Sequence, residues 1–182
     1  MKTLKMHLII PLIILLAYAC KKDKVDPLSQ LPPATQTGAR TFGCLVNGQA
    51  FVAKGTSFYD MLGLSASYNN VTFYIQGRHK NSDGSITQIG FNIDTINLVP
   101  GQTYTINLNS GKKKGDGSGG YDVVGLRTPS GANGDIFYYT NNVVSGSVTI
   151  TSLANATAGT FYFNAVSSTG DTVKITNGRF DW

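Results

Sequence analysis

Residues 159–165 read Gly-Thr-Phe-Tyr-Phe-Asn-Ala, and this stretch decides the fold class. Phe161 and Phe163 alternate with Thr160 and Asn164. Successive side chains of a β-strand point to opposite faces, so the stretch predicts a strand with one buried and one exposed face. The same alternation recurs in segments 71–77, 88–94, 104–109, 147–151, 172–176 and 179–182.

Turn signals separate these segments, and the clearest is Asn47-Gly48. Both central positions of the tightest hairpin turn need a positive φ angle, which Asn and Gly tolerate best. With that turn, Cys44 faces Phe51 in a hairpin that spans residues 41–53. A second hairpin is expected around Asn69-Asn70.

Composition agrees with an all-β chain. All ten acidic residues are Asp, and 21 residues are Gly; Glu is the acid that helices favour, whereas Asp and Gly favour turns. We expect about nine to eleven short strands in an antiparallel β-sandwich, because no segment carries a helical apolar stripe. A lipocalin-like barrel is the alternative.

The first residues read as an export signal. Lys2 and Lys5 precede the apolar run 8–16, and small residues follow it. The run is about half the ~20 residues that a membrane-spanning helix needs. We therefore interpret residues 1–19 as a signal peptide.

Cys20 follows Ala17-Tyr18-Ala19 directly. Its place at the cleavage point resembles that of the lipid-acceptor cysteine of bacterial lipoproteins, which carries palmitate-like acyl chains. Tyr18 departs from the usual pattern, and Ala17-Tyr18-Ala19 also suits the general signal peptidase. The alternatives are therefore a lipid anchor at Cys20 or a cleaved, secreted chain.

Residues 20–40 are expected to be a disordered, lipid-anchored tether, because they are rich in Pro, Ser, Gln and Thr and lack apolar periodicity. Residues 41–182 then form a single all-β domain. Loss of residues 1–19 removes Lys2 and Lys5 and lowers the formal net charge from +5 to +3. So mild a charge gives no reason to expect nucleic-acid binding.

Four stretches together resemble small all-β lipoproteins of unknown function from Bacteroidetes-type bacteria. They are residues 41–48, 146–151, 159–165 and 173–181, the last reading Val-Lys-Ile-Thr-Asn-Gly-Arg-Phe-Asp. The resemblance implies a cell-envelope protein at the outer membrane, periplasmic or surface-facing. It brings no catalytic or binding residues.

Chemistry-bearing residues are sparse, and no cofactor or metal site is predicted. Cys44 is expected to pack as a small apolar residue, and His79 to be a solvated loop side chain. Gly115, Gly117 and Gly120 spell a dinucleotide fingerprint, but residues 121–125 read as strand where that motif needs a helix. We interpret residues 109–120 as an exposed loop.

Four tyrosines on polar faces form a candidate ligand surface, because exposed rings can stack on sugars. They are Tyr74, Tyr138, Tyr139 and Tyr162. Ordinary cross-strand pairing is the alternative interpretation. Thr95 and Thr172 lie in Asp-Thr-apolar triplets that resemble O-glycosylation sites of the same bacteria.

The sequence favours a non-catalytic envelope lipoprotein that is structural or docks onto a partner protein. The alternative is a glycan- or ligand-binding lipoprotein of an uptake system. A glycoside hydrolase that uses two Asp carboxylates is a remote alternative, since it needs both on one cleft.

Overall fold

A computed structural model describes residues 25–54, 64–69, 72–82, 86–94, 98–106, 120–122, 124–127, 136–141 and 143–182. These residues form a short 3-10 helix and twelve strands. The elements are η1 (Pro27–Gln30), β1 (Thr41–Val46), β2 (Gln49–Val52), β3 (Leu64–Asn69), β4 (Thr72–Lys80), β5 (Ile86–Asp94), β6 (Thr103–Ile106), β7 (Gly120–Asp122), β8 (Val124–Arg127), β9 (Ile136–Tyr139), β10 (Gly146–Ser152), β11 (Ala158–Ser167) and β12 (Thr172–Asp181).

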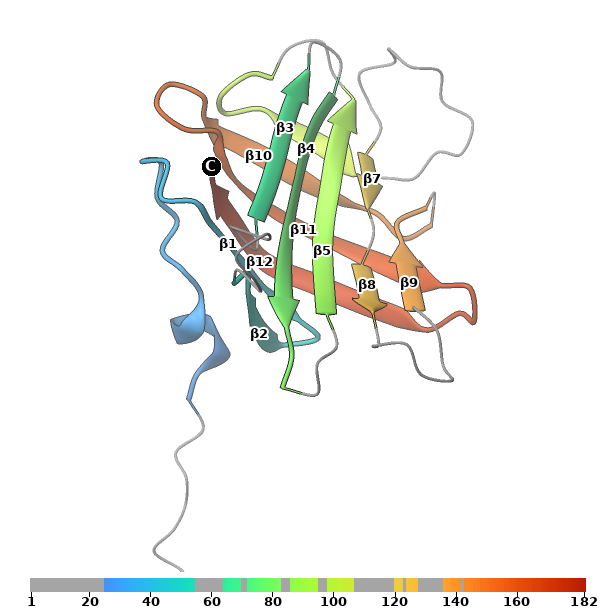
Figure 1. Cartoon of the computed structure of the whole chain (residues 1–182). Helices are drawn as coiled ribbons and strands as arrows, with labels where there is room; N and C mark the ends of the chain where they lie inside the picture. The colour runs from blue at the N-terminus through green and yellow to red at the C-terminus, as the bar shows by residue number, and fades with distance from the viewer. Residues whose placement is uncertain are drawn as a thin grey trace, which may run out of the picture.

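The strands form two packed layers with antiparallel pairing throughout (Figure 1). One layer has the order β2-β1-β12-β11-β10-β6, and the other carries β3, β4 and β5 with the short strands β7, β8 and β9. A two-residue ladder between β9 and β11 joins the layers along one side. The predicted β-sandwich is confirmed, and the sheet does not close into a barrel. The described residues contain twelve strands, one more than the upper end of the predicted range.

The first hairpin has the predicted register. Cys44 pairs with Phe51, and the turn residues Asn47 and Gly48 have φ angles of 48° and 82°. In the second hairpin Asn69 pairs with Thr72, so β3 includes a residue that the sequence assigned to the turn. Compared with a two-residue turn at Asn69-Asn70, the pairing of β3 with β4 is shifted by two residues. Because side chains alternate with a period of two, a shift of two residues keeps the predicted faces of the two strands together.

The core lies between the layers and is dominated by phenylalanine. Where the alternating segments are described, their apolar members lie mostly inside, as the period of two predicts. The Phe161 ring sits among its neighbours, with its centroid 5.0 Å from that of Phe42 and 5.1 Å from that of Phe91. The largest fully buried side chains are Phe42, Phe73, Phe91, Phe163, Phe180, Ile75, Ile89, Ile93, Ile106, Ile150, Ile175 and Val148.

Asp181 is the exception to this pattern, because a strand position expected on the polar face is only 1% exposed. The N-terminal segment covers it. The Thr35 hydroxyl donates to Oδ2 at 2.6 Å, the Thr37 N–H donates to Oδ2 at 2.9 Å and the Gly38 N–H donates to Oδ1 at 2.8 Å. Burial alone raises the pKa of Asp181, but these hydrogen bonds outweigh it and hold the pKa below the ordinary value of 3.8.

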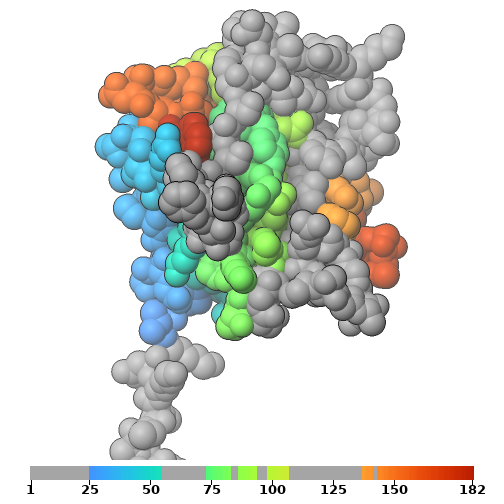
Figure 2. Space-filling view, viewed as in Figure 1, coloured from blue at the N-terminus to red at the C-terminus, as the bar shows by residue number. Residues whose placement is uncertain are grey.

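The expectation of a disordered tether over residues 20–40 is therefore wrong for residues 25–40. Helix η1 is capped by Asp26, whose Oδ1 accepts from the Leu28 N–H at 3.0 Å. Residues 31–40, which we name the N-terminal strap, lie across the outer face of β1 and β12. Figure 2 shows the blue atoms of this part of the chain against the edge of the sandwich.

Three further features hold the strap. The side chain of Leu31 is buried, with 8% of its surface exposed. Pro32 occupies the space beside Gly43, where a β-carbon would lie 2.6 Å from the proline Cδ. Arg179 donates from Nη1 to the Pro32 carbonyl at 3.2 Å. Because the strap depends on partners about 145 positions away, its own composition gives no sign of it.

Candidate functional site

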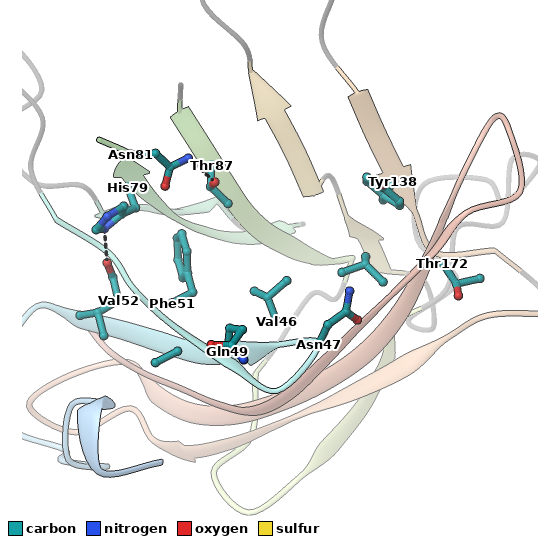
Figure 3. Close-up of a pocket in the computed structure, with 12 residues that line it drawn as sticks. Val46, Asn47, Gln49, Phe51, Val52, His79, Asn81, Thr87, Tyr138 and Thr172 are labelled. Carbon is teal, nitrogen blue, oxygen red and sulfur yellow. Dashed lines mark hydrogen bonds between the residues drawn. The ribbon is translucent and has the colours of Figure 1, made fainter. Parts of the chain in front are cut away.

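A pocket of about 320 Å³ opens between the layers at the end of the sandwich that carries the β1–β2 turn (Figure 3). Its apolar side is formed by Val46, Ala50, Phe51, Val52 and Val173, with the ring of Tyr138. Its polar groups come from Asn47, Gln49, His79, Asn81, Thr87 and Thr172. A mixed lining of apolar wall and a few polar groups, at this volume, is typical of small-ligand sites.

His79 is held in a defined orientation at this pocket. The residue lies in β4 and is half-buried, which corrects the expectation of a solvated loop side chain. Its Nδ1 is 3.0 Å from the Val52 carbonyl oxygen, and its ring centroid is 6.1 Å from that of Phe51. A carbonyl oxygen only accepts, so Nδ1 is the donor in this hydrogen bond.

The same corner joins the two layers through the backbone. The Lys54 N–H donates to the Arg78 carbonyl at 2.8 Å, just beyond the point where β3 stops pairing with β4. Together with the bond from His79 to Val52, this contact fixes the β1–β2 hairpin against β4. The pocket wall is therefore part of the rigid sandwich rather than of a free loop.

The amide side chains are also positioned by hydrogen bonds. Asn47 Oδ1 accepts from the Lys174 N–H at 2.8 Å, and Asn81 Nδ2 donates to Thr87 Oγ1 at 3.1 Å. These hydrogen bonds fix the orientation of both amide side chains. The pocket thus presents oriented neutral groups before any ligand arrives, which lowers the entropic cost of binding.

No acidic residue, lysine or arginine is among the twelve described residues that line the pocket. Its polar groups are amides, hydroxyls and one imidazole. A charged ligand would lose its hydration there without gaining an opposite charge, which is costly. The lining therefore suits a neutral ligand with several hydrogen-bonding groups.

The structure does not bring the four predicted tyrosines onto one surface. Tyr138 lines the pocket, whereas Tyr162 is 59% exposed on the outer face of β11. Tyr139 stacks on Phe137 with ring centroids 6.2 Å apart. Tyr74 donates to the side-chain oxygen of Gln76 on β4. The four tyrosines therefore belong to separate sites. Tyr138 and Tyr139 are neighbours in β9 and face opposite ways, because consecutive side chains of a strand alternate between its faces.

The remaining predicted residues fall as follows. Cys44 is fully buried opposite Phe51, as predicted. Thr172 is exposed at the start of β12 and lines the pocket. Cys20, Thr95 and most of the glycine-rich stretch 109–120 lie outside the described residues. Residues 121–125 belong to β7 and β8 wherever they are described, as the strand prediction required.

Most pocket residues escaped sequence reasoning. Asn47 and Asn81 lie in turn signals, so the sequence assigned them to turns, and Gln49 and Thr87 lie on ordinary polar strand positions. These four residues come from two hairpins, β1–β2 and β4–β5, which only the tertiary fold brings to one end. Alternation predicts which face a residue occupies, but it does not predict which turns meet.

Within the described part of the chain, no three His, Cys, Asp or Glu side chains lie close enough to hold a metal ion. The same residues contain no helix long and apolar enough to cross a membrane. A scan against protein-family models, a search of curated proteins and a search of solved structures each returned no match.

Proposed function

We propose that this chain is a non-catalytic lipoprotein of the bacterial cell envelope whose sandwich binds a small, neutral, polyhydroxylated ligand such as a sugar. The observation that carries the proposal is the neutral, pre-oriented polar lining of the pocket beside the rings of Phe51 and Tyr138. Hydroxyl groups of a sugar both donate and accept, which matches amide and hydroxyl partners. The less polar face of a sugar ring fits an aromatic wall.

Of the two non-catalytic functions that the sequence leaves open, the pocket favours ligand binding. The sequence favoured a structural or partner-docking role, whereas a concave site with oriented polar groups favours ligand binding. A hydrolase would need two carboxylates on one cleft, and the described lining supplies His79 and neutral groups instead.

Envelope anchoring rests on the signal-like residues 1–19 and on Cys20. The strap limits how far the domain would stand from the membrane, because residues from 31 onward belong to the folded unit. Residues 20–30, which include helix η1, remain as the link to the membrane and would span at most about 40 Å even if they were fully extended. The domain would therefore work close to the surface of the bilayer.

The pocket is tested by filling it. Val46→Phe places a larger ring on the inner face of β1, inside the pocket, and should weaken binding of a neutral sugar by more than about tenfold. Gln49→Ala removes one amide and should weaken binding about three- to tenfold. Calorimetry of the purified domain against a panel of neutral mono- and disaccharides is the measurement.

The control is Asn164→Ala, which removes an amide from an exposed position of β11 that lies outside the pocket lining. It should leave the affinity unchanged. Neutral ligands should also bind equally at low and high salt, because no charge is neutralised. The proposal fails if no neutral saccharide binds at millimolar concentration, or if Val46→Phe binds as tightly as the original domain.

The anchor is tested at the new N-terminus. We expect mass spectrometry of protein extracted from membranes to show two or three acyl chains on Cys20 as the first residue. Cys20→Ser should move the protein from the membrane fraction to the soluble fraction, because each buried methylene contributes about 0.8 kcal/mol of membrane affinity. A mature N-terminus with an unmodified Cys20 thiol would contradict the anchor and leave the pocket proposal standing.

A further inference from the structure

A second concavity, of about 550 Å³, lies on the outer face of the sandwich, away from the pocket. One wall is the strap, at Ala34, and the other is the exposed ring of Tyr162 on β11. Ser147, Thr160 and Asn177 lie among the lining residues between them. We name this feature the strap groove.

Tyr162 presents an aromatic surface to solvent. It is 59% exposed and pairs with Ser147 across β10 and β11. The neighbouring residues Phe161 and Phe163 point into the core, which fixes the strand and leaves the Tyr162 ring outside. A rigid aromatic ring bordered by hydroxyl groups suits the stacking of a sugar ring, because one end is apolar and the other can form hydrogen bonds.

Arg179 is the one charged residue among the described groove residues. Its Nη1 donates to the Pro32 carbonyl at 3.2 Å and its Nε donates to the Asn177 carbonyl at 3.5 Å. These bonds hold the guanidinium beside the strap while using two of its five N–H donors. The planar fork of an arginine matches a carboxylate in both geometry and charge.

The single positive charge among the described groove residues favours a ligand group with one negative charge. One arginine balances one carboxylate, whereas a phosphate monoester carries about two negative charges at neutral pH. Thr160, which pairs with Arg179, and Asn177, which bulges outward at a φ angle of 53°, add neutral partners for hydroxyl groups. We propose that the strap groove binds carboxylate-bearing sugar units of an acidic polysaccharide, such as a polyuronate. None of the residues that line the pocket lines the strap groove.

The test compares tri-galacturonate with its methyl ester, which keeps the sugar rings and removes the charge. By calorimetry of the purified domain at low salt, we expect the acid to bind at least about tenfold more tightly than the ester. We expect Arg179→Gln to abolish this preference, and Tyr162→Ala to weaken both probes by about tenfold. Affinity for the acid should fall as salt rises.

The matched control is Lys174→Gln, which removes an exposed positive charge from the same strand outside the groove lining. It should keep the preference for the acid. Because Arg179 also holds the strap, the thermal unfolding of each variant is measured beside its affinity. Equal binding of acid and ester, or an unchanged affinity in Tyr162→Ala, overturns the proposal. Val46→Phe, which fills the pocket, should leave tri-galacturonate binding intact, and this result separates the two sites.

Discussion

Asp181→Asn lowers the free energy of unfolding by about 2–4 kcal/mol, since hydrogen bonds to a charged group contribute about 1.5–3 kcal/mol each and are not additive. The carboxylate is 1% exposed and accepts from Thr35, Thr37 and Gly38. An amide of the same shape offers one acceptor and turns its NH₂ group toward a backbone donor. Urea denaturation measures the loss.

The same bonds predict the acid sensitivity of the domain. The pKa of Asp181 is lower in the folded state than its ordinary value of 3.8, so its contribution is complete above about pH 4 and is lost as the pH falls through the lowered pKa. The original domain should therefore lose stability below about pH 4 more steeply than Asp181→Asn.

Asp171→Asn is the matched control, because Asp171 is exposed at the β11–β12 turn and accepts from the Thr169 hydroxyl at 2.8 Å. We expect it to cost less than about 1 kcal/mol, as is usual for an exposed polar pair. Equal losses in the two variants would show that the bonds to the strap contribute nothing. Faster proteolysis between residues 25 and 40 in Asp181→Asn alone would locate the loss in the strap.

Phe161→Ala should lower the free energy of unfolding by about 3–5 kcal/mol, the usual cost of truncating a buried phenylalanine. Its ring is 3% exposed, and its centroid lies 5.0 Å from that of Phe42 and 5.1 Å from that of Phe91. It also packs against Gly178, where a β-carbon would lie 2.5 Å from its ring carbons. Truncation therefore leaves a cavity that neither layer can close.

Tyr162→Ala gives a sharp control, because it removes a ring of similar size from the next residue of the same strand. Tyr162 faces solvent, so we expect a change within about 0.5 kcal/mol. Urea denaturation of both variants at the same pH compares the two faces of β11. Equal losses would contradict the assignment of Phe161 to the core and Tyr162 to the surface.

Much of the fold follows from local pattern. Alternation placed Phe161 and Phe163 inside and Thr160 outside, since the side-chain period of a strand is two. Asn47-Gly48 set the register of the first hairpin, down to the pairing of Cys44 with Phe51, because a two-residue turn leaves one register. Both are properties of neighbouring residues, which a sequence displays directly.

Asp181 and His79 are two residues whose surroundings the local sequence pattern does not predict. Asp181 lies on an outward strand position and His79 near a strand end, so the sequence predicts that both are solvated; yet the strap covers Asp181, and the Val52 carbonyl accepts a hydrogen bond from His79. Both partners are distant in the chain. Nothing local distinguishes an aspartate that binds water from one that binds a backbone about 145 residues away.

The sequence by itself determined the alternating strands and the register of the first hairpin, and it predicts an export signal at residues 1–19. Only the tertiary structure decided that residues 31–40 belong to the folded unit, and that Gln49, His79 and Thr172 share one pocket. The physical reason is the separation of the interacting residues along the chain. The alternation that marks a strand is a pattern of neighbouring residues. The strap and the pocket instead depend on which distant elements the packed layers bring together.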